Sequence, residues 1–186
     1  MENLDRKTVA ILATNGFEES ELSEPLKALK NAGADVHIIS EKSGKIKGWA
    51  NGDWSNEYTV DKTISEVNES GYNALVLPGG VMNPDTLRRN EDAVRFVKSF
   101  FTNKKPVAAI CHAPWLLAEA DVLRGRKMTS YDSIKRDMVN AGAKWEDSEV
   151  VVDEGLVTSR NPNDLPAFCS KLVEEVYEGK HEMQTA

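Results

Sequence analysis

Short apolar runs alternate along this chain with longer stretches in which apolar residues recur every three or four positions. Residues 8–14, 34–40, 74–80 and 106–111 are rich in aliphatic and β-branched side chains, a composition typical of strands that are buried on both faces. Because helical stretches separate these strands, the pattern predicts a mainly parallel sheet with helices covering both of its faces.

The periodic stretches predict the helices that cover the sheet. In residues 18–32, Leu22, Leu26 and Leu29 share one face, and Gly33 can end the helix. Pro25 either bends this helix or marks its true start. The other predicted helices span 61–70, 90–105, 114–123, 132–142 and 164–179.

The remaining segments predict smaller elements. Residues 41–60 contain three glycines and predict turns or a hairpin, and 127–131 predict a short strand. Residues 149–160 predict two strands joined by a turn, and the tail from Lys180 is expected to be loose. With 186 residues and no repeat or linker, we expect one domain over 1–186, with a core of about 7–178.

Charge and composition exclude several classes of protein. A formal net charge of -7, with acids interspersed among the basic residues, argues against a nucleic-acid-binding face. No apolar run has the roughly 20 residues that a membrane-spanning helix needs, and we expect no secretory signal at the N-terminus. The two cysteines, Cys111 and Cys169, are therefore expected to be reduced thiols of a cytoplasmic protein.

Three segments with chemical groups follow predicted strands, where the sites of parallel sheets lie. The segment AAICHAP places Cys111 and His112 where a strand turns into a helix. Such a turn exposes its central residue, and a helix N-terminus favours a thiolate, so we expect a lowered thiol pKa and nearby amides that hold an oxyanion. The alternative is a buried structural cysteine, and Cys169 is expected to be buried and inert.

His112 is the best placed of three histidines to assist the thiol. Neighbours on a regular element face apart, so only a strained turn would bring the two side chains together; otherwise His112 bonds nearby backbone. Glu18, in NGFEES, could meet Cys111 across the crevice or could simply serve the helix dipole. Asp85, in PGGVMNPD, could cap a turn. No cysteine or histidine has metal-ligand spacing, so we expect no metal and no cofactor.

The segments ILATNGFEESEL, ALVLPGG, PVAAICHAPWLLAEADVLRGRKMTSY, IKRDMVNAGAKW and VVVDEGLVTSRNPNDLPAF resemble, in this order, the ThiJ/PfpI family. The resemblance covers roughly residues 7–175. It is strongest to the PfpI-type intracellular proteases and general stress proteins, within the class I glutamine amidotransferase-like superfamily. It implies a flavodoxin-like three-layer sandwich.

The resemblance also implies roles for individual residues. Cys111 takes the place of the nucleophile, Glu18 that of an acid whose protonated carboxyl contacts it, and His112 that of the adjacent histidine. Asp85 lies near the position of an acid that a neighbouring subunit contributes, which implies a homodimer or hexamer. The backbone amides of Gly80 and His112 would form the oxyanion hole.

The function that the resemblance implies first is that of a cysteine-dependent hydrolase of the PfpI protease type with a stress-protective role. The alternatives are a cofactor-free glyoxalase or deglycase acting on methylglyoxal or glycated amines, and a redox sensor or holdase chaperone without turnover. A small carbonyl or a peptide would be the substrate in the enzymatic cases, because both offer a carbonyl carbon to a thiolate. Neither nucleic acid nor membrane is an expected partner.

Overall fold

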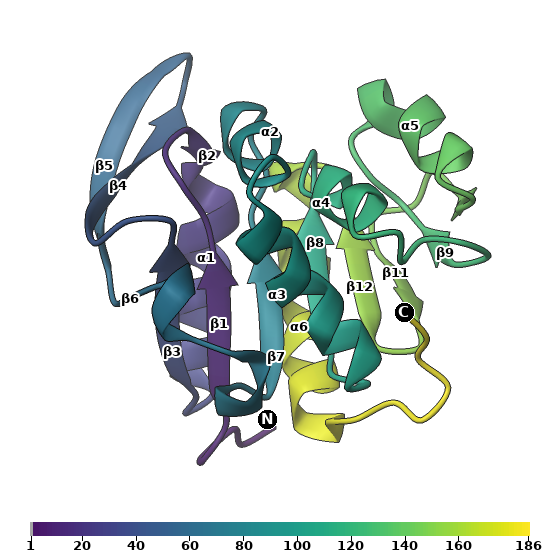
Figure 1. Cartoon of the computed structure of the whole chain (residues 1–186), viewed down its shortest axis with the longest axis horizontal. Coiled ribbons are helices and arrows are strands. Elements are labelled where there is room, and N and C mark those ends of the chain that lie inside the picture. Colours follow the sequence, from purple (N-terminus) through teal and green to yellow (C-terminus); the bar gives the residue numbers. More distant parts are fainter. Residues whose placement is uncertain (1) are drawn as a thin grey trace.

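The central element of this computed structural model, which describes residues 2–186, is a seven-stranded sheet (Figure 1). The strand order is β11-β12-β8-β7-β1-β3-β6. All neighbouring pairs are parallel except β11 and β12, which form an antiparallel hairpin at one edge. The strands are β1 Thr8–Leu12, β3 Asp35–Ser40, β6 Lys62–Thr63, β7 Ala74–Leu77, β8 Val107–Ile110, β11 Val151–Asp153 and β12 Leu156–Ser159.

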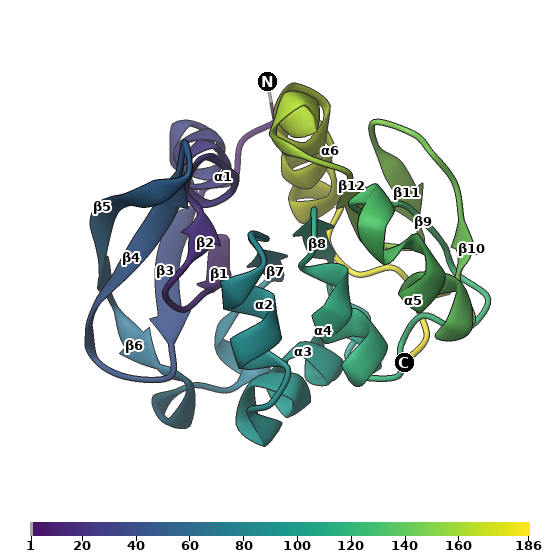
Figure 2. The same cartoon turned by 90° about the horizontal axis from the view of Figure 1, so that it is seen from above.

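Helices cover both faces of this sheet, as Figure 2 shows in the view along it. On one face, Leu22, Leu29, Phe168 and Leu172 of α1 and α6 pack against Val9 and other residues of the central strands. The opposite face is covered by α3 and α4 in a second apolar cluster. The helices are α1 Glu19–Asn31, α2 Met82–Leu87, α3 Glu91–Thr102, α4 Pro114–Glu119, α5 Lys135–Asn140 and α6 Leu165–Glu178. The flavodoxin-like α/β sandwich is thereby confirmed.

Two smaller sheets lie outside the seven-stranded sheet. β4 (Gly44–Ala50) and β5 (Asp53–Val60) form the hairpin expected in residues 41–60, and β2 (Phe17–Glu18) pairs with β4. β9 (Lys127–Met128) pairs with β10 (Lys144–Trp145). The strand expected in residues 127–131 is therefore confirmed.

Three expectations differ from the structure. The helix predicted over 61–70 is instead β6 followed by two 3-10 turns, because Lys62–Thr63 pairs with β3 and Asn68 caps the second turn. α2 was not predicted. The tail, expected to be loose, is held by hydrogen bonds from its own His181 backbone amide to the Lys104 carbonyl oxygen and from Arg126 to the Thr185 carbonyl oxygen.

Candidate active site

Cys111 occupies a strained turn between β8 and α4. Its φ of 64° lies in the left-handed region that non-glycine residues rarely adopt. Two backbone hydrogen bonds hold this conformation: the Cys111 amide donates to the Ser159 carbonyl at 3.0 Å, and the Tyr131 amide donates to the Cys111 carbonyl at 2.9 Å. The turn therefore depends on β12 and on the segment that follows β9.

The turn brings the side chains of Cys111 and His112 into contact. Cys111 Sγ lies 3.1 Å from His112 Nδ1, and His112 Nε2 lies 3.1 Å from Ser133 Oγ. The imidazole stacks on Tyr131 at 4.7 Å between centroids and meets the edge of Trp115. Burial lowers the pKa of His112, against an opposing effect of Asp132. A neutral imidazole can accept the thiol proton at Nδ1 while it donates from Nε2 to Ser133.

The acid against the thiol is Glu21, not Glu18. Glu21 is completely buried, its Oε2 accepts the Gly79 amide at 2.8 Å, and its carboxyl lies within hydrogen-bonding reach of Cys111. Burial raises the pKa of Glu21 to about 8, partly offset by the Gly79 amide, so the carboxyl holds its proton at neutral pH.

Glu18 lies one helical turn away from that position. It is half-buried at the end of β2, and its side chain bonds Ser20. Burial raises the pKa of Glu18, and the charge of Glu19 raises it further. The expected contact of Glu18 with the thiol is thus corrected, because β2 carries this residue into its pairing with Trp49 before α1 begins.

The loop after β7 closes the site from the other side. The backbone amides of Gly80 and His112 lower the pKa of the Cys111 thiol; their role as an oxyanion hole stays a prediction. A Cβ atom at Gly79 would stand 2.6 Å from Glu21 Oε2 and 2.8 Å from Cys111 Cβ, which leaves only glycine room there. Asn83 fixes the loop by donating to the carbonyls of Pro78 and Gly79 at 2.9 and 3.1 Å.

The structure corrects the expected direction of the thiol pKa. Burial raises the pKa of Cys111, whose exposed fraction is 7%, and a charged Glu21 raises it further. The Gly80 and His112 amides act in the opposite direction. Protonation of Glu21 removes the like charge and offers a hydrogen-bond donor to the thiolate, so thiol and carboxyl share their protons as one pair.

Asp85 does not contact His112 within one chain. It lies in α2, half-exposed, and pairs with Arg88. The Arg88 guanidinium stacks over Trp115 at 4.5 Å, and Trp115 in turn touches the His112 ring. The role of Asp85 toward a neighbouring subunit stays a prediction.

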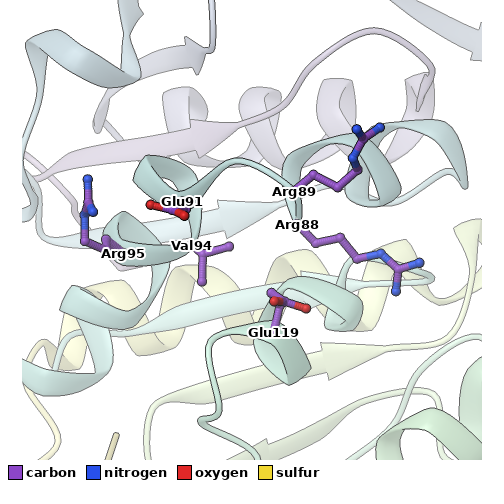
Figure 3. Close-up of a pocket in the computed structure, with 6 residues that line it drawn as sticks. All are labelled: Arg88, Arg89, Glu91, Val94, Arg95 and Glu119. Atoms are coloured by element: carbon purple, nitrogen blue, oxygen red, sulfur yellow. The ribbon is translucent and has the colours of Figure 1, made fainter.

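Two cavities flank this part of the molecule. One of about 330 Å³ is lined by residues that include Tyr131, whose ring stacks on His112, but not by Cys111 or His112 themselves. The other, of about 550 Å³, lies between α3 and α4 and is lined by side chains that do not include the thiol (Figure 3). Cys169 is partly exposed between α1 and α6, and burial together with Glu24 raises its pKa to about 12.

Sequence reasoning missed Glu21, Asn83 and Ser133. Glu21 had a recognisable pattern, because it shares the buried face of its helix with Pro25 and Leu29 at intervals of four residues. An acidic residue such as Glu21 on an otherwise apolar helix face indicates a functional carboxyl group. Glu18 was chosen instead because it lies at the end of the loop that follows the first strand. Asn83 and Ser133 carry no comparable pattern.

No helix among residues 2–186 combines the length and the apolar composition that a bilayer crossing requires. The model of the DJ-1/PfpI family matches residues 7–175. General stress protein 18 of Bacillus subtilis (strain 168) is 50% identical over 163 residues, covering 87% of this chain and 93% of the relative. Protein/nucleic acid deglycase 2 of Escherichia coli (strain K12) is 47% identical over 163 residues, with the same coverage of both chains.

A solved structure from Anabaena variabilis supports the same assignment. It is a two-domain protein with DJ-1/ThiJ/PfpI-like and ferritin-like domains, and it superposes with a TM-score of 0.87 at 40% identity. The match covers 92% of this chain and 48% of that one. The resemblance drawn from the sequence motifs is confirmed by these matches.

Proposed function

The chain belongs to the DJ-1/PfpI family, and on that premise we propose that it is an enzyme in which the thiolate of Cys111 attacks an electrophilic carbonyl carbon. The contact of 3.1 Å between Cys111 Sγ and His112 Nδ1 carries this proposal. A thiol beside a neutral imidazole, which is itself oriented by a third group, is the arrangement that nucleophilic catalysis requires. Ser133 is the orienting group in this chain.

Addition to the carbonyl forms a carbon–sulfur bond and breaks the carbonyl π bond. The thiol proton passes to His112 Nδ1, and the carbonyl oxygen becomes an oxyanion that the Gly80 and His112 amides can stabilise. Both amides are near enough to the sulfur to lower the pKa of the Cys111 thiol. An oxyanion formed next to Sγ therefore finds its donors in place, and the protonated imidazole can neutralise it.

With methylglyoxal as the substrate, the adduct is a hemithioacetal and the second step is a proton transfer. The ionised form of Glu21 removes the hydrogen from the carbon bound to sulfur and returns it as a proton to the neighbouring carbonyl carbon. The hydroxyl proton moves at the same time from the oxygen of the first carbon to the oxygen of the second. The product is a thioester, which water hydrolyses to lactate and the free thiol. A carboxyl with a pKa of about 8 suits both directions of this transfer near neutral pH.

The burial of the thiol favours a small carbonyl, either free or carried as a glycation adduct on an amine, as the substrate. An extended peptide would need to bring its backbone carbonyl to the side chain of a cysteine residue that is only 7% exposed. The order of substrate classes is therefore the reverse of the one that the sequence favours, and peptide hydrolysis is the second candidate. The protein would act in a reducing, cytoplasmic setting that keeps Cys111 as a thiol.

A panel of three substrates tests this proposal: methylglyoxal, a lysine derivative glycated by methylglyoxal, and fluorogenic peptides. The panel is run with the wild type, Cys111→Ala and the matched control Cys169→Ala. We expect turnover of the first two substrates by the wild type and by Cys169→Ala, and background rates with Cys111→Ala. Turnover of peptides alone would favour the protease function. No turnover, together with equal protection of aggregating client proteins by all three forms, would establish a holdase instead.

A further inference from the structure

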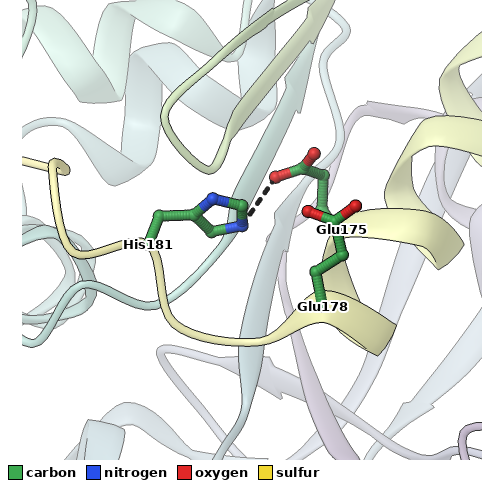
Figure 4. Close-up of side chains that lie close together, drawn as sticks. All are labelled: Glu175, Glu178 and His181. Carbon is green, nitrogen blue, oxygen red and sulfur yellow. Dashed lines mark ion pairs between the residues drawn. The ribbon is translucent and has the colours of Figure 1, made fainter.

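Three potential metal ligands converge where the C-terminal tail returns to α6. Glu175 and Glu178 lie on the last turn of this helix and His181 lies just beyond it (Figure 4). Ligand atoms of the three side chains all lie within 4.8 Å of one another. His181 Nε2 and Glu175 Oε2 are 2.8 Å apart.

Several buried polar atoms at this place lack a hydrogen bond. Glu175 is 5% exposed, yet its Oε2 has no hydrogen-bond partner, and His181 Nε2 has none either. The two atoms face each other as an ion pair at 2.8 Å, whose geometry is not that of a hydrogen bond (Figure 4). Gln184, which is 3% exposed, also leaves both amide atoms without a partner. Such atoms are costly to bury, so their number at one place calls for an explanation.

The backbone around the cluster is shaped to receive His181. Gly155 has a φ of 82°, and a Cβ atom there would stand 2.8 Å from His181 Cδ2 and 3.4 Å from Gln184 Oε1. The His181 amide donates to the Lys104 carbonyl at 3.0 Å, and Lys104 Nζ bonds the carbonyl of Glu182 at 2.7 Å. The backbone of the tail at His181 and Glu182 is thus held in place.

We propose that Glu175, Glu178 and His181 bind a divalent transition-metal ion, for which zinc is the best fit. Zinc takes imidazole nitrogen and carboxylate oxygen at about 2.0–2.2 Å in tetrahedral geometry, so two of its ligands lie roughly 3.3–3.6 Å apart. Glu175 Oε2 and His181 Nε2, now 2.8 Å apart, would have to separate by roughly 0.5–0.8 Å to bind one ion. The exposed Glu178 can close on the ion, and water or Gln184 Oε1 can complete the coordination.

The metal site would stabilise the structure, and it lies apart from the candidate active site at Cys111. Gly155 precedes β12, whose first residue pairs with Val107 at the beginning of β8. The cluster therefore lies at the end of the sheet where the parallel strands begin, whereas Cys111 follows the C-terminal end of β8. Bound metal would hold the C-terminal tail against α6 and the β11–β12 turn. It would also provide a ligand contact for buried polar atoms that make no hydrogen bond.

The proposal is tested by titrating the metal-free full-length protein with zinc in an isothermal titration calorimeter. The variants are His181→Ala and Glu175→Gln, with Glu174→Gln as the matched control on the same helix. Cys111→Ser removes the thiol of the candidate active site, which could also attract zinc. We expect one zinc ion per chain in the wild type, Glu174→Gln and Cys111→Ser. Binding should be about tenfold or more weaker in the two ligand variants.

A second readout separates loss of a ligand from loss of the fold. Zinc should raise the melting temperature of the wild type and of Glu174→Gln, because it binds the native state, but not that of His181→Ala. Circular dichroism without metal should show that His181→Ala is folded. Absence of zinc binding in the wild type, binding that survives in His181→Ala, or binding lost only in Cys111→Ser would overturn the proposal.

Discussion

The sulfur of Cys111 lies 3.1 Å from the Nδ1 of His112, although the two residues are adjacent in the chain. Adjacent side chains on a strand point to opposite faces, and the positive φ of Cys111 breaks that alternation. Two hydrogen bonds hold this strained conformation, one from the Cys111 amide to the Ser159 carbonyl of β12 and one from the Tyr131 amide to the Cys111 carbonyl. The contact between the Cys111 and His112 side chains therefore depends on β12 and Tyr131, and not on the dipeptide alone.

The first prediction distinguishes Glu21 from Glu18. Glu21→Gln keeps an acceptor for the Gly79 amide and a donor for the sulfur but cannot carry a proton between carbons. Turnover of methylglyoxal should therefore fall by about 100-fold or more, the usual contribution of general acid–base catalysis. Glu18→Gln, the matched control, should change it only a few-fold. Equal losses in steady-state assays of the two variants would contradict the assignment of Glu21.

The second prediction concerns the pH dependence of stability. The pKa of Glu21 is raised to about 8 in the folded protein, while an unfolded glutamate ionises near about 4.3. Between these values the native state holds a proton that the unfolded state releases. The contribution of Glu21 to stability is therefore complete below about pH 4.3 and is lost as the pH rises toward 8, by an amount on the order of 5 kcal/mol.

Urea unfolding at pH 5 and pH 8.5 measures this effect. The difference in unfolding free energy between the two pH values should be several kcal/mol smaller in Glu21→Gln than in the wild type. Identical differences in the two proteins would mean that Glu21 ionises normally in the folded state.

The third prediction concerns the glycine between the acid and the thiol. Gly79→Ala would force its new methyl group against Glu21 Oε2, the Ile110 carbonyl and Cys111 Cβ, all within 2.8 Å. We expect a loss of about 1–3 kcal/mol in stability and turnover reduced by about 100-fold, since small displacements of catalytic groups are costly. Gly71→Ala is the matched control, because nothing lies within 4 Å of its added Cβ. Wild-type rates in purified, folded Gly79→Ala would refute this account of the loop.

The fourth prediction concerns Asp85 and a neighbouring subunit. If the acid acts across an interface, Cys111→Ala and Asp85→Asn should each be impaired alone. Mixed after unfolding and refolding together, they should recover up to about a quarter of wild-type activity, the share of intact sites in randomly formed dimers. Light scattering gives the assembly state in parallel. Full activity of Asp85→Asn alone, or no recovery in a proven mixed oligomer, would remove Asp85 from the site.

The sequence predicted the sheet and the place of the nucleophile well, for physical reasons. Buried parallel strands such as β7 and β8 leave continuous apolar runs, and a small-residue turn before Pro114 marks where the strand gives way to a helix. α2 escaped prediction because MNPDTL is short and has too few apolar positions to show a period.

The remaining errors concern choices that only packing decides. Glu18 and Glu21 are one turn apart, and which of them faces Cys111 depends on β2 pairing with β4. The tail is polar, and its sequence predicts no regular structure. In the fold, however, His181 packs against Gly155, and Lys104 Nζ donates a hydrogen bond to the Glu182 carbonyl. The thiol pKa was assigned from the helix end alone, whereas burial against Glu21 acts in the opposite direction.

The most direct test of the central claim is mass spectrometry of the Glu21→Gln variant after brief exposure to methylglyoxal. This variant retains the dyad but lacks the group that moves the proton, so the first adduct should accumulate. The account predicts one methylglyoxal adduct on the peptide that contains Cys111 and none on the peptide that contains Cys169. It also predicts that the adduct is absent after Cys111→Ala. A Cys111 peptide that stays unmodified, while the wild type turns the substrate over, would contradict the claim that this thiol attacks the carbonyl.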